Sequence, residues 1–238
     1  MFQIHFWERT FRSLFLDNTT SNGKVFVYKN VSTQFYELGS GNSTILVIPG
    51  LGQSLNSWLK IAKALSENFR VIILELPNRG KKQNQTKLWS EKEFANYVIA
   101  FINRHTKEKL ILIGHSLGGK ISALVATLIG KKIRYLILYA VGGVKTNLPT
   151  TKNVVRFLKH LIYPNKSNVD FVLIYKKISI PTLLIYGEND VITPVEIGKR
   201  ISKLITNAKL KIVPNGTHLA HEEFSNLFIN EIKINLFL

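Results

Sequence analysis

One serine of this sequence lies in surroundings that suit nucleophilic chemistry. The run Gly114-His115-Ser116-Leu117-Gly118 follows apolar residues 110–113 and precedes a helical pattern over 117–129. In a tight turn from strand to helix, the residues two before and two after the serine must be small, and both are glycine. The hydroxyl of Ser116 would then project from the carboxyl end of a strand, beside a helix N-terminus that favours negative charge. The pattern predicts a nucleophile.

An acid and a base would complete such a site, because a serine hydroxyl needs a base to take its proton and the base needs an orienting acid. Asp190 follows a clear late strand, and His218 comes directly after the last predicted strand. We therefore expect Ser116 as nucleophile, His218 as base and Asp190 as acid. The alternative acids are Glu188 and Asp170, and His221 is expected at the surface or just behind the base.

The remaining part of such a site is an oxyanion hole, in which backbone N–H groups stabilise the negative oxygen of a tetrahedral intermediate. One donor is expected to be the N–H of Leu117, directly after the nucleophile. The other should come from a loop after an earlier strand. Pro49-Gly50-Leu51-Gly52 follows the apolar run 45–48 and has glycines for close backbone approach. The N–H of Leu51 is the candidate.

Alternating strands and helices must position these residues. Short, almost wholly apolar strands separated by helices of 10–15 residues indicate a parallel sheet covered on both faces. An antiparallel pair of strands precedes this region. Strands are predicted at 25–29, 33–38, 45–48, 71–74, 110–113, 133–139, 181–186 and 208–213, and helices at 56–67, 91–104, 117–129, 195–205 and 222–236.

Length and composition indicate one folded domain. The chain has 238 residues, 45% of them hydrophobic, and no cysteine. This excludes a disulfide framework, a Cys-ligated zinc site, an iron–sulfur cluster and a cysteine nucleophile. The prediction is a single domain over 1–238, with an N-terminal extension over 1–23 and an insertion over 144–179 that interrupts the alternation.

The charge balance leaves two interpretations open. The formal net charge is +17, with basic residues spread along the whole chain. Either the composition is biased towards lysine, or the protein has a site for polyanions. Because no nucleic-acid motif accompanies the charge, no specific nucleic-acid partner is expected.

Membrane contact at the N-terminus is likewise an open alternative. No run reaches the ~18 apolar residues of a spanning helix, and the first residues lack a basic signal-peptide region. A cytoplasmic protein is therefore expected. An aromatic stripe at helical spacing either docks on its own domain or lies peripherally on an anionic membrane. The stripe consists of Ile4, Trp7, Phe11, Leu14 and Phe15.

The order of Ser116, Asp190 and His218 on an alternating β/α chain resembles the α/β-hydrolase family, specifically its small, lid-bearing esterase-like members. Residues 35–41, the Pro-Gly-Leu-Gly loop, Glu75-Leu-Pro-Asn-Arg-Gly80 and Gly187-Glu-Asn-Asp190 are similar to family motifs over roughly residues 25–238. Two departures border the site: Pro49 stands where many members have histidine, and Asn78-Arg79 replaces the usual Gly-His.

The resemblance implies an α/β fold with a mostly parallel sheet of about eight strands, helices on both faces and a small cap at 144–179. It implies a serine esterase or lipase-like enzyme that forms an acyl-enzyme intermediate and needs no metal or organic cofactor. The expected substrate is an acyl ester. The apolar helical face and basic outside of the cap suggest a lipid, and the alternative is a cap that simply buries that face on the domain.

Other activities on the same scaffold are a proline-iminopeptidase-like peptidase, a thioesterase or a hydrolase of C–C bonds. Such peptidases usually carry tryptophan after the serine, where this chain has Leu117. A haloalkane dehalogenase is disfavoured, because it needs aspartate at position 116. A non-catalytic binding protein on this fold is the remaining alternative.

Overall fold

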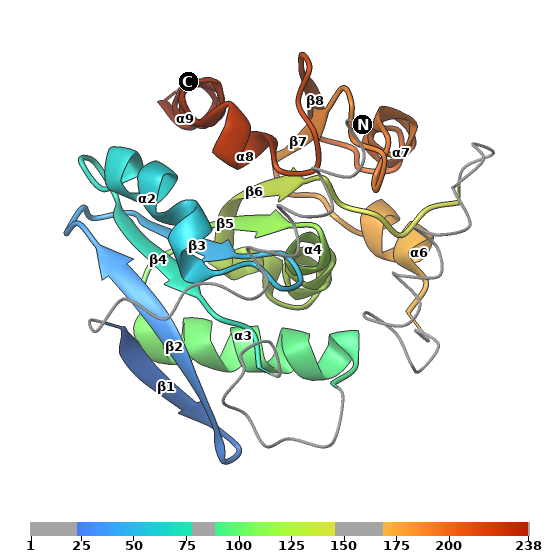
Figure 1. The fold of residues 1–238 in the computed structure, drawn as a ribbon. Coiled ribbons are helices and arrows are strands. Elements are labelled where there is room, and N and C mark those ends of the chain that lie inside the picture. Colours follow the sequence, from blue (N-terminus) through green and yellow to red (C-terminus); the bar gives the residue numbers. More distant parts are fainter. Residues whose placement is uncertain (1–22, 78–88, 146–168, 238) are drawn as a thin grey trace.

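A computed structural model describes residues 23–77, 89–145 and 169–237 (Figure 1). Most of the predicted N-terminal extension, part of the 75–80 motif and most of the predicted cap lie outside these ranges. The strands and helices of the sheet region lie within these ranges.

The described residues form an eight-stranded sheet in the order β1-β2-β4-β3-β5-β6-β7-β8. The first two strands are antiparallel to their neighbours, and the rest are parallel. The mostly parallel sheet expected from the sequence is confirmed. The strands are β1 (Lys24–Tyr28), β2 (Val31–Leu38), β3 (Thr44–Ile48), β4 (Arg70–Leu74), β5 (Leu110–His115), β6 (Ile133–Tyr139), β7 (Thr182–Gly187) and β8 (Ala208–Val213).

Helices cover both faces of the sheet (Figure 1). Helices α3, α4, α6 and α7 pack on one face, and α2, α8 and α9 on the other. Side chains of a strand alternate between the two cores: Leu46 and Ile48 face the first, Ile45 and Val47 the second. The helices are α2 (Leu59–Leu65), α3 (Glu91–His105), α4 (Leu117–Ile129), α6 (Phe171–Lys176), α7 (Val195–Ser202), α8 (Ala220–Glu223) and α9 (Ser225–Phe237).

Local sequence explains these elements. All five residues of β3 are buried, as expected of a central parallel strand with helices on both sides. Helix α3 begins with a capping box, in which the side chain of Ser90 accepts the N–H of Glu93 and the Glu93 carboxylate accepts the N–H of Ser90. No helix in the described ranges is long and apolar enough to cross a membrane.

Two predicted helices are interrupted in the structure, and the one predicted over 195–205 ends at Ser202. The segment predicted as one helix over 222–236 is two, α8 and α9, because the backbone at Phe224 leaves the helical region (φ −123°, ψ 43°). The helix predicted over 56–67 begins as a 3₁₀ turn over Leu55–Trp58, where the side chain of Ser54 accepts the N–H of Asn56. Periodicity alone does not show such local breaks.

The sheet topology determines where a site can form. After β3 the chain continues to β4 on one side, whereas β5 pairs with β3 on the other. Ligands of open α/β sheets bind at such a switch point, outside the carboxyl ends of the strands. The loop after β3 and the turn after β5 meet there, and these carry the predicted oxyanion donor and nucleophile.

Candidate active site

The nucleophile turn joins β5 to α4 with a strained serine. Ser116 has φ 52° and ψ −113°, a conformation that L-residues rarely adopt. Its N–H donates to the carbonyl of Tyr139 at the end of β6, at 2.8 Å. A Cβ at Gly118 would collide with the backbone oxygens of Ile48 and Pro49. The small residue expected two positions after the serine, Gly118, is therefore required because the end of β3 and the loop after it lie so close.

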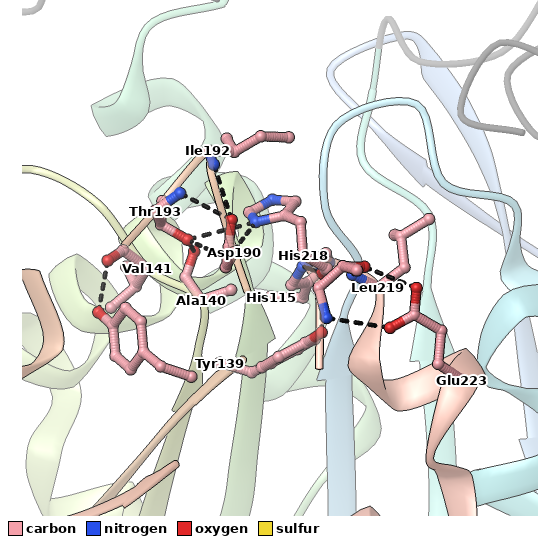
Figure 2. Close-up of polar contacts among 12 residues, drawn as sticks. His115, Tyr139, Ala140, Val141, Asp190, Ile192, Thr193, His218, Leu219 and Glu223 are labelled. Carbon is pink, nitrogen blue, oxygen red and sulfur yellow. Dashed lines mark hydrogen bonds and ion pairs between the residues drawn. The ribbon is translucent and has the colours of Figure 1, made fainter. Parts of the chain in front are cut away.

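The predicted acid and base lie in contact. The Nδ1 of His218 is 2.8 Å from Oδ2 of Asp190, and both residues are buried (Figure 2). The other carboxylate oxygen, Oδ1, accepts the N–H groups of Ile192 and Thr193 at 2.8 and 2.9 Å. The hydroxyl of Thr193 donates to Oδ2 at 2.7 Å. A carboxylate held in this way fixes a proton on Nδ1 of His218 and leaves Nε2 as the ring nitrogen that accepts a proton.

Neither alternative acid contacts the base. The carboxylate of Glu188 accepts the N–H of Asn215 at 2.9 Å. Asp170 caps helix α6 by accepting the N–H groups of Val172 and Leu173. Of the three candidate acids, all within the described residues, Asp190 is the one whose carboxylate contacts the ring of His218.

The loop that carries His218 reaches back to the nucleophile turn. The carbonyl oxygen of His218 accepts the hydroxyl of Tyr139 at 2.7 Å and lies 3.0 Å from Nε2 of His115. His115 directly precedes Ser116, so the base is anchored beside the turn. No hydrogen bond joins the hydroxyl of Ser116 to the ring of His218, both of which are described; such contacts often form only when substrate binds.

The predicted oxyanion donors lie at the two meeting loops. Leu117 is the first residue of α4, and the first N–H groups of a helix have no acceptor within it. Leu51 lies in a turn that is closed by Gln53 N–H to Gly50 O at 3.3 Å, and Gly52 has φ 71°. The side chain of Gln53 also accepts the N–H of Gly50 at 2.7 Å. That the N–H groups of Leu51 and Leu117 donate to an oxyanion stays a prediction.

Three residues that surround this site were not predicted from the sequence, and His221 was expected at the surface or just behind the base. The surface alternative for His221 is wrong, since the residue is 1% exposed and its ring stacks on Trp58 with centroids 4.6 Å apart. No sequence signal pairs residues so far apart in the chain. The three are Gln53, His115 and Tyr139.

Burial perturbs the titration of the two histidines beneath the base. It lowers the pKa of His115 well below its ordinary value, and the proximity of His218 and His221 adds to this. Burial, assisted by His218, lowers the pKa of His221 to about 3. Both rings are therefore neutral at neutral pH. Burial also raises the pKa of Tyr139 well above its ordinary value, so its hydroxyl stays a donor.

Acid should destabilise the protein through these two histidines. In the unfolded chain both rings take up protons near pH 6.5, so below that pH the unfolded state binds more protons than the folded one. We expect the free energy of unfolding to fall by up to about 4 kcal/mol between pH 7 and 5, measured by urea denaturation. His221→Gln should remove about half of that decline. An unchanged slope in the variant would contradict the assignment.

Gly187, the last residue of β7, lies against the base loop. A Cβ there would collide with the backbone oxygens of Gly216 and Thr217. Gly187→Ala should therefore lower the free energy of unfolding by about 1–3 kcal/mol. Gly130→Ala is the matched control: nothing lies within 4 Å of its Cβ position and its backbone is helical, so stability should stay equal or rise. Equal effects in urea denaturation would contradict the packing argument.

The described residues contain no group of three or more His, Cys, Asp or Glu side chains that could hold a metal ion.

Comparison with known proteins places the chain in a family. A family model described as alpha/beta hydrolase fold matches residues 43–177, and a second, described as TAP-like protein, matches residues 161–231. The first match spans more than half of the chain. The chain therefore belongs to the α/β-hydrolase family, and the protein is a hydrolase of this fold.

Relatives within this family differ in activity. The pimeloyl-[acyl-carrier protein] methyl ester esterase of Wigglesworthia glossinidia brevipalpis is 28% identical over 249 residues, covering 82% of this chain and 94% of the relative. The 2-hydroxy-6-oxononadienedioate/2-hydroxy-6-oxononatrienedioate hydrolase of Escherichia coli K12 is 21% identical over 263 residues, covering 87% and 91%. A solved structure of a membrane phospholipase A superposes with a TM-score of 0.78 at 21% identity, covering 98% of this chain and 90% of the other. That last likeness concerns the fold.

Proposed function

We propose that the protein is a carboxylic ester hydrolase in which Ser116 is the nucleophile, His218 the base and Asp190 the orienting acid. The observation that carries the proposal is the buried Asp190–His218 pair, 2.8 Å apart, anchored through the His218 carbonyl beside the nucleophile turn. This arrangement is what activation of a serine hydroxyl requires.

In the first half of the reaction, the hydroxyl oxygen of Ser116 attacks the acyl carbonyl while Nε2 of His218 takes the hydroxyl proton. The N–H groups of Leu51 and Leu117 stabilise the oxyanion that forms. The intermediate then breaks its bond to the alkoxide, which takes the proton from His218 and leaves as the alcohol. Water repeats the steps on the acyl-enzyme, releasing the acid and restoring Ser116, while Asp190 stabilises the charged imidazole.

An ester substrate is supported by the methyl ester esterase among the relatives. Hydrolysis of a C–C bond is the second candidate, because another relative is a hydrolase of that kind.

We further propose that residues 1–238 form one domain with a cap over 144–179, and that the acyl group is lipid-like. Peripheral contact with an anionic membrane belongs to the same proposal.

Hydrolysis of p-nitrophenyl esters of increasing chain length tests the function. Turnover that Ser116→Ala abolishes would support an esterase, and the optimal chain length would separate short acyl groups from lipid. A 2-hydroxy-6-oxo-dienoate supplies the comparison for C–C cleavage. Turnover of the dienoate with no ester turnover would overturn the ester assignment in favour of the second candidate.

A further inference from the structure

One buried imidazole touches three parts of the proposed site. His115 is 1% exposed and is joined to Ser116 by a peptide bond. Its Nδ1 lies 2.7 Å from Oε1 of Gln53, and its Nε2 lies 3.0 Å from the carbonyl oxygen of His218. Gln53 Oε1 also accepts the N–H of Gly50 at 2.7 Å. The ring thus connects the nucleophile turn with the oxyanion loop (residues 49–53) and the base loop.

Packing holds the ring in this place. Its face stacks on Tyr139, with ring centroids 4.4 Å apart and an interplanar angle of 20°; Figure 2 shows both residues beneath His218. A Cβ at Gly50 would lie 2.7 Å from Nδ1 of His115, so the oxyanion loop approaches the ring edge as closely as a glycine allows. A ring that is confined on its face and at its edge can transmit position from one loop to another.

The single N–H of a neutral imidazole can make only one of the two contacts of the His115 ring a hydrogen bond. Both neighbours of the ring are carbonyl oxygens, which only accept, and a neutral imidazole has one N–H. Without a proton, the 2.7 Å contact to Gln53 would be more repulsive than the 3.0 Å contact to His218. Each oxygen also accepts another hydrogen bond, from the Gly50 N–H and from the Tyr139 hydroxyl respectively, so the difference in distance decides between them. The proton therefore belongs on Nδ1, facing Gln53.

We propose that His115 is a positioning residue that holds the oxyanion loop in register with Ser116, by donating its Nδ1–H to the side chain of Gln53. The proposal rests on the proposed function, since the loop matters only if its N–H groups meet an oxyanion. His115 touches no reacting atom; its effect passes through Gln53 to Gly50, next to the predicted donor Leu51.

Three variants test this. His115→Phe keeps an aromatic ring over Tyr139 but has no donor, and Gln53→Met keeps the size but has no acceptor. Each should lower kcat by about 10- to 100-fold with KM little changed, because a loop shifted by a fraction of an ångström loses oxyanion stabilisation. His115→Asn restores an N–H near the Nδ1 position and should recover most of the loss. Because the effect of His115 passes through Gln53, the double variant should be no worse than Gln53→Met alone.

A readout that does not need turnover separates this proposal from the proposed function. Hydrogen exchange at the Gly50 amide should accelerate about tenfold in His115→Phe and Gln53→Met, because its acceptor is displaced or removed. The control is Thr106→Val, which removes a buried hydrogen bond to the carbonyl of Ile102 at the C-terminus of α3. It should leave both kcat and Gly50 exchange unchanged.

Either of two results would overturn the role of His115. One is a folded His115→Phe protein with wild-type kcat and wild-type exchange at Gly50. The other is a double variant whose losses multiply. Absence of ester hydrolysis by the wild type would instead refute the proposed function, and accelerated exchange at Gly50 would then still establish the His115–Gln53 connection.

Discussion

Replacing Ser116 by alanine is expected to lower ester hydrolysis by about 10⁴-fold or more, with the fold intact. In the proposed mechanism the hydroxyl oxygen of Ser116 forms the bond of the acyl-enzyme, and no other serine lies on the nucleophile turn. Oxyanion stabilisation and binding would remain, so a small residual rate above that in water is expected. The comparison is steady-state turnover of a p-nitrophenyl ester by the two proteins.

Ser116→Gly is the matched variant for the backbone of the turn. It also lacks the hydroxyl and should be equally inactive. Because Ser116 has φ 52°, glycine should relieve strain there, and Ser116→Gly should be more stable than Ser116→Ala by about 1 kcal/mol. Wild-type turnover by either variant would refute the nucleophile assignment. Equal stabilities in urea denaturation would refute the strain.

Asp190→Asn should reduce turnover by roughly 10³- to 10⁴-fold without unfolding the protein. The amide oxygen can still accept the N–H groups of Ile192 and Thr193, as Oδ1 does now. The amide nitrogen would take the place of Oδ2 and donate towards Nδ1 of His218. His218 would then carry its proton on Nε2, where it cannot take the proton of Ser116.

Glu188→Gln is the control for that experiment. Glu188 lies in the same loop as Asp190, but its carboxylate is exposed and accepts the N–H of Asn215. Turnover by this variant should remain within about twofold of wild type, since surface polar contacts contribute little. The acid assignment would fail if Glu188→Gln lost activity and Asp190→Asn kept it.

The fold could be predicted because its signals are local. Buried parallel strands are largely apolar runs, and that of β6 (Ile133–Tyr139) has the predicted bounds. The edge strand β8 (Ala208–Val213), which is only partly buried, also has the predicted bounds. The helix bounds of α4 (Leu117–Ile129) are also as predicted. The two helices that end the chain were merged in the prediction, because the break at Phe224 is a single residue inside an otherwise helical pattern.

Only those contacts of the site that follow from the topology of the sheet could be predicted from the sequence. Strand ends of a parallel sheet share one edge, so Asp190 and His218 could be expected to meet. The contact of His115 with Gln53 joins residues 62 positions apart and depends on how two loops pack at the switch point. Likewise, nothing in the sequence around His221 shows that its ring stacks on Trp58.

Labelling with a fluorophosphonate probe is the decisive test of an activated serine, because the probe reacts with such a serine whatever the natural substrate is. The proposed triad predicts that wild type and Glu188→Gln are labelled, that Ser116→Ala is not, and that Asp190→Asn reacts far more slowly. Mass spectrometry of the labelled peptide should place the adduct on Ser116. A folded wild-type protein that takes no label, or a label that persists in Ser116→Ala, would contradict it.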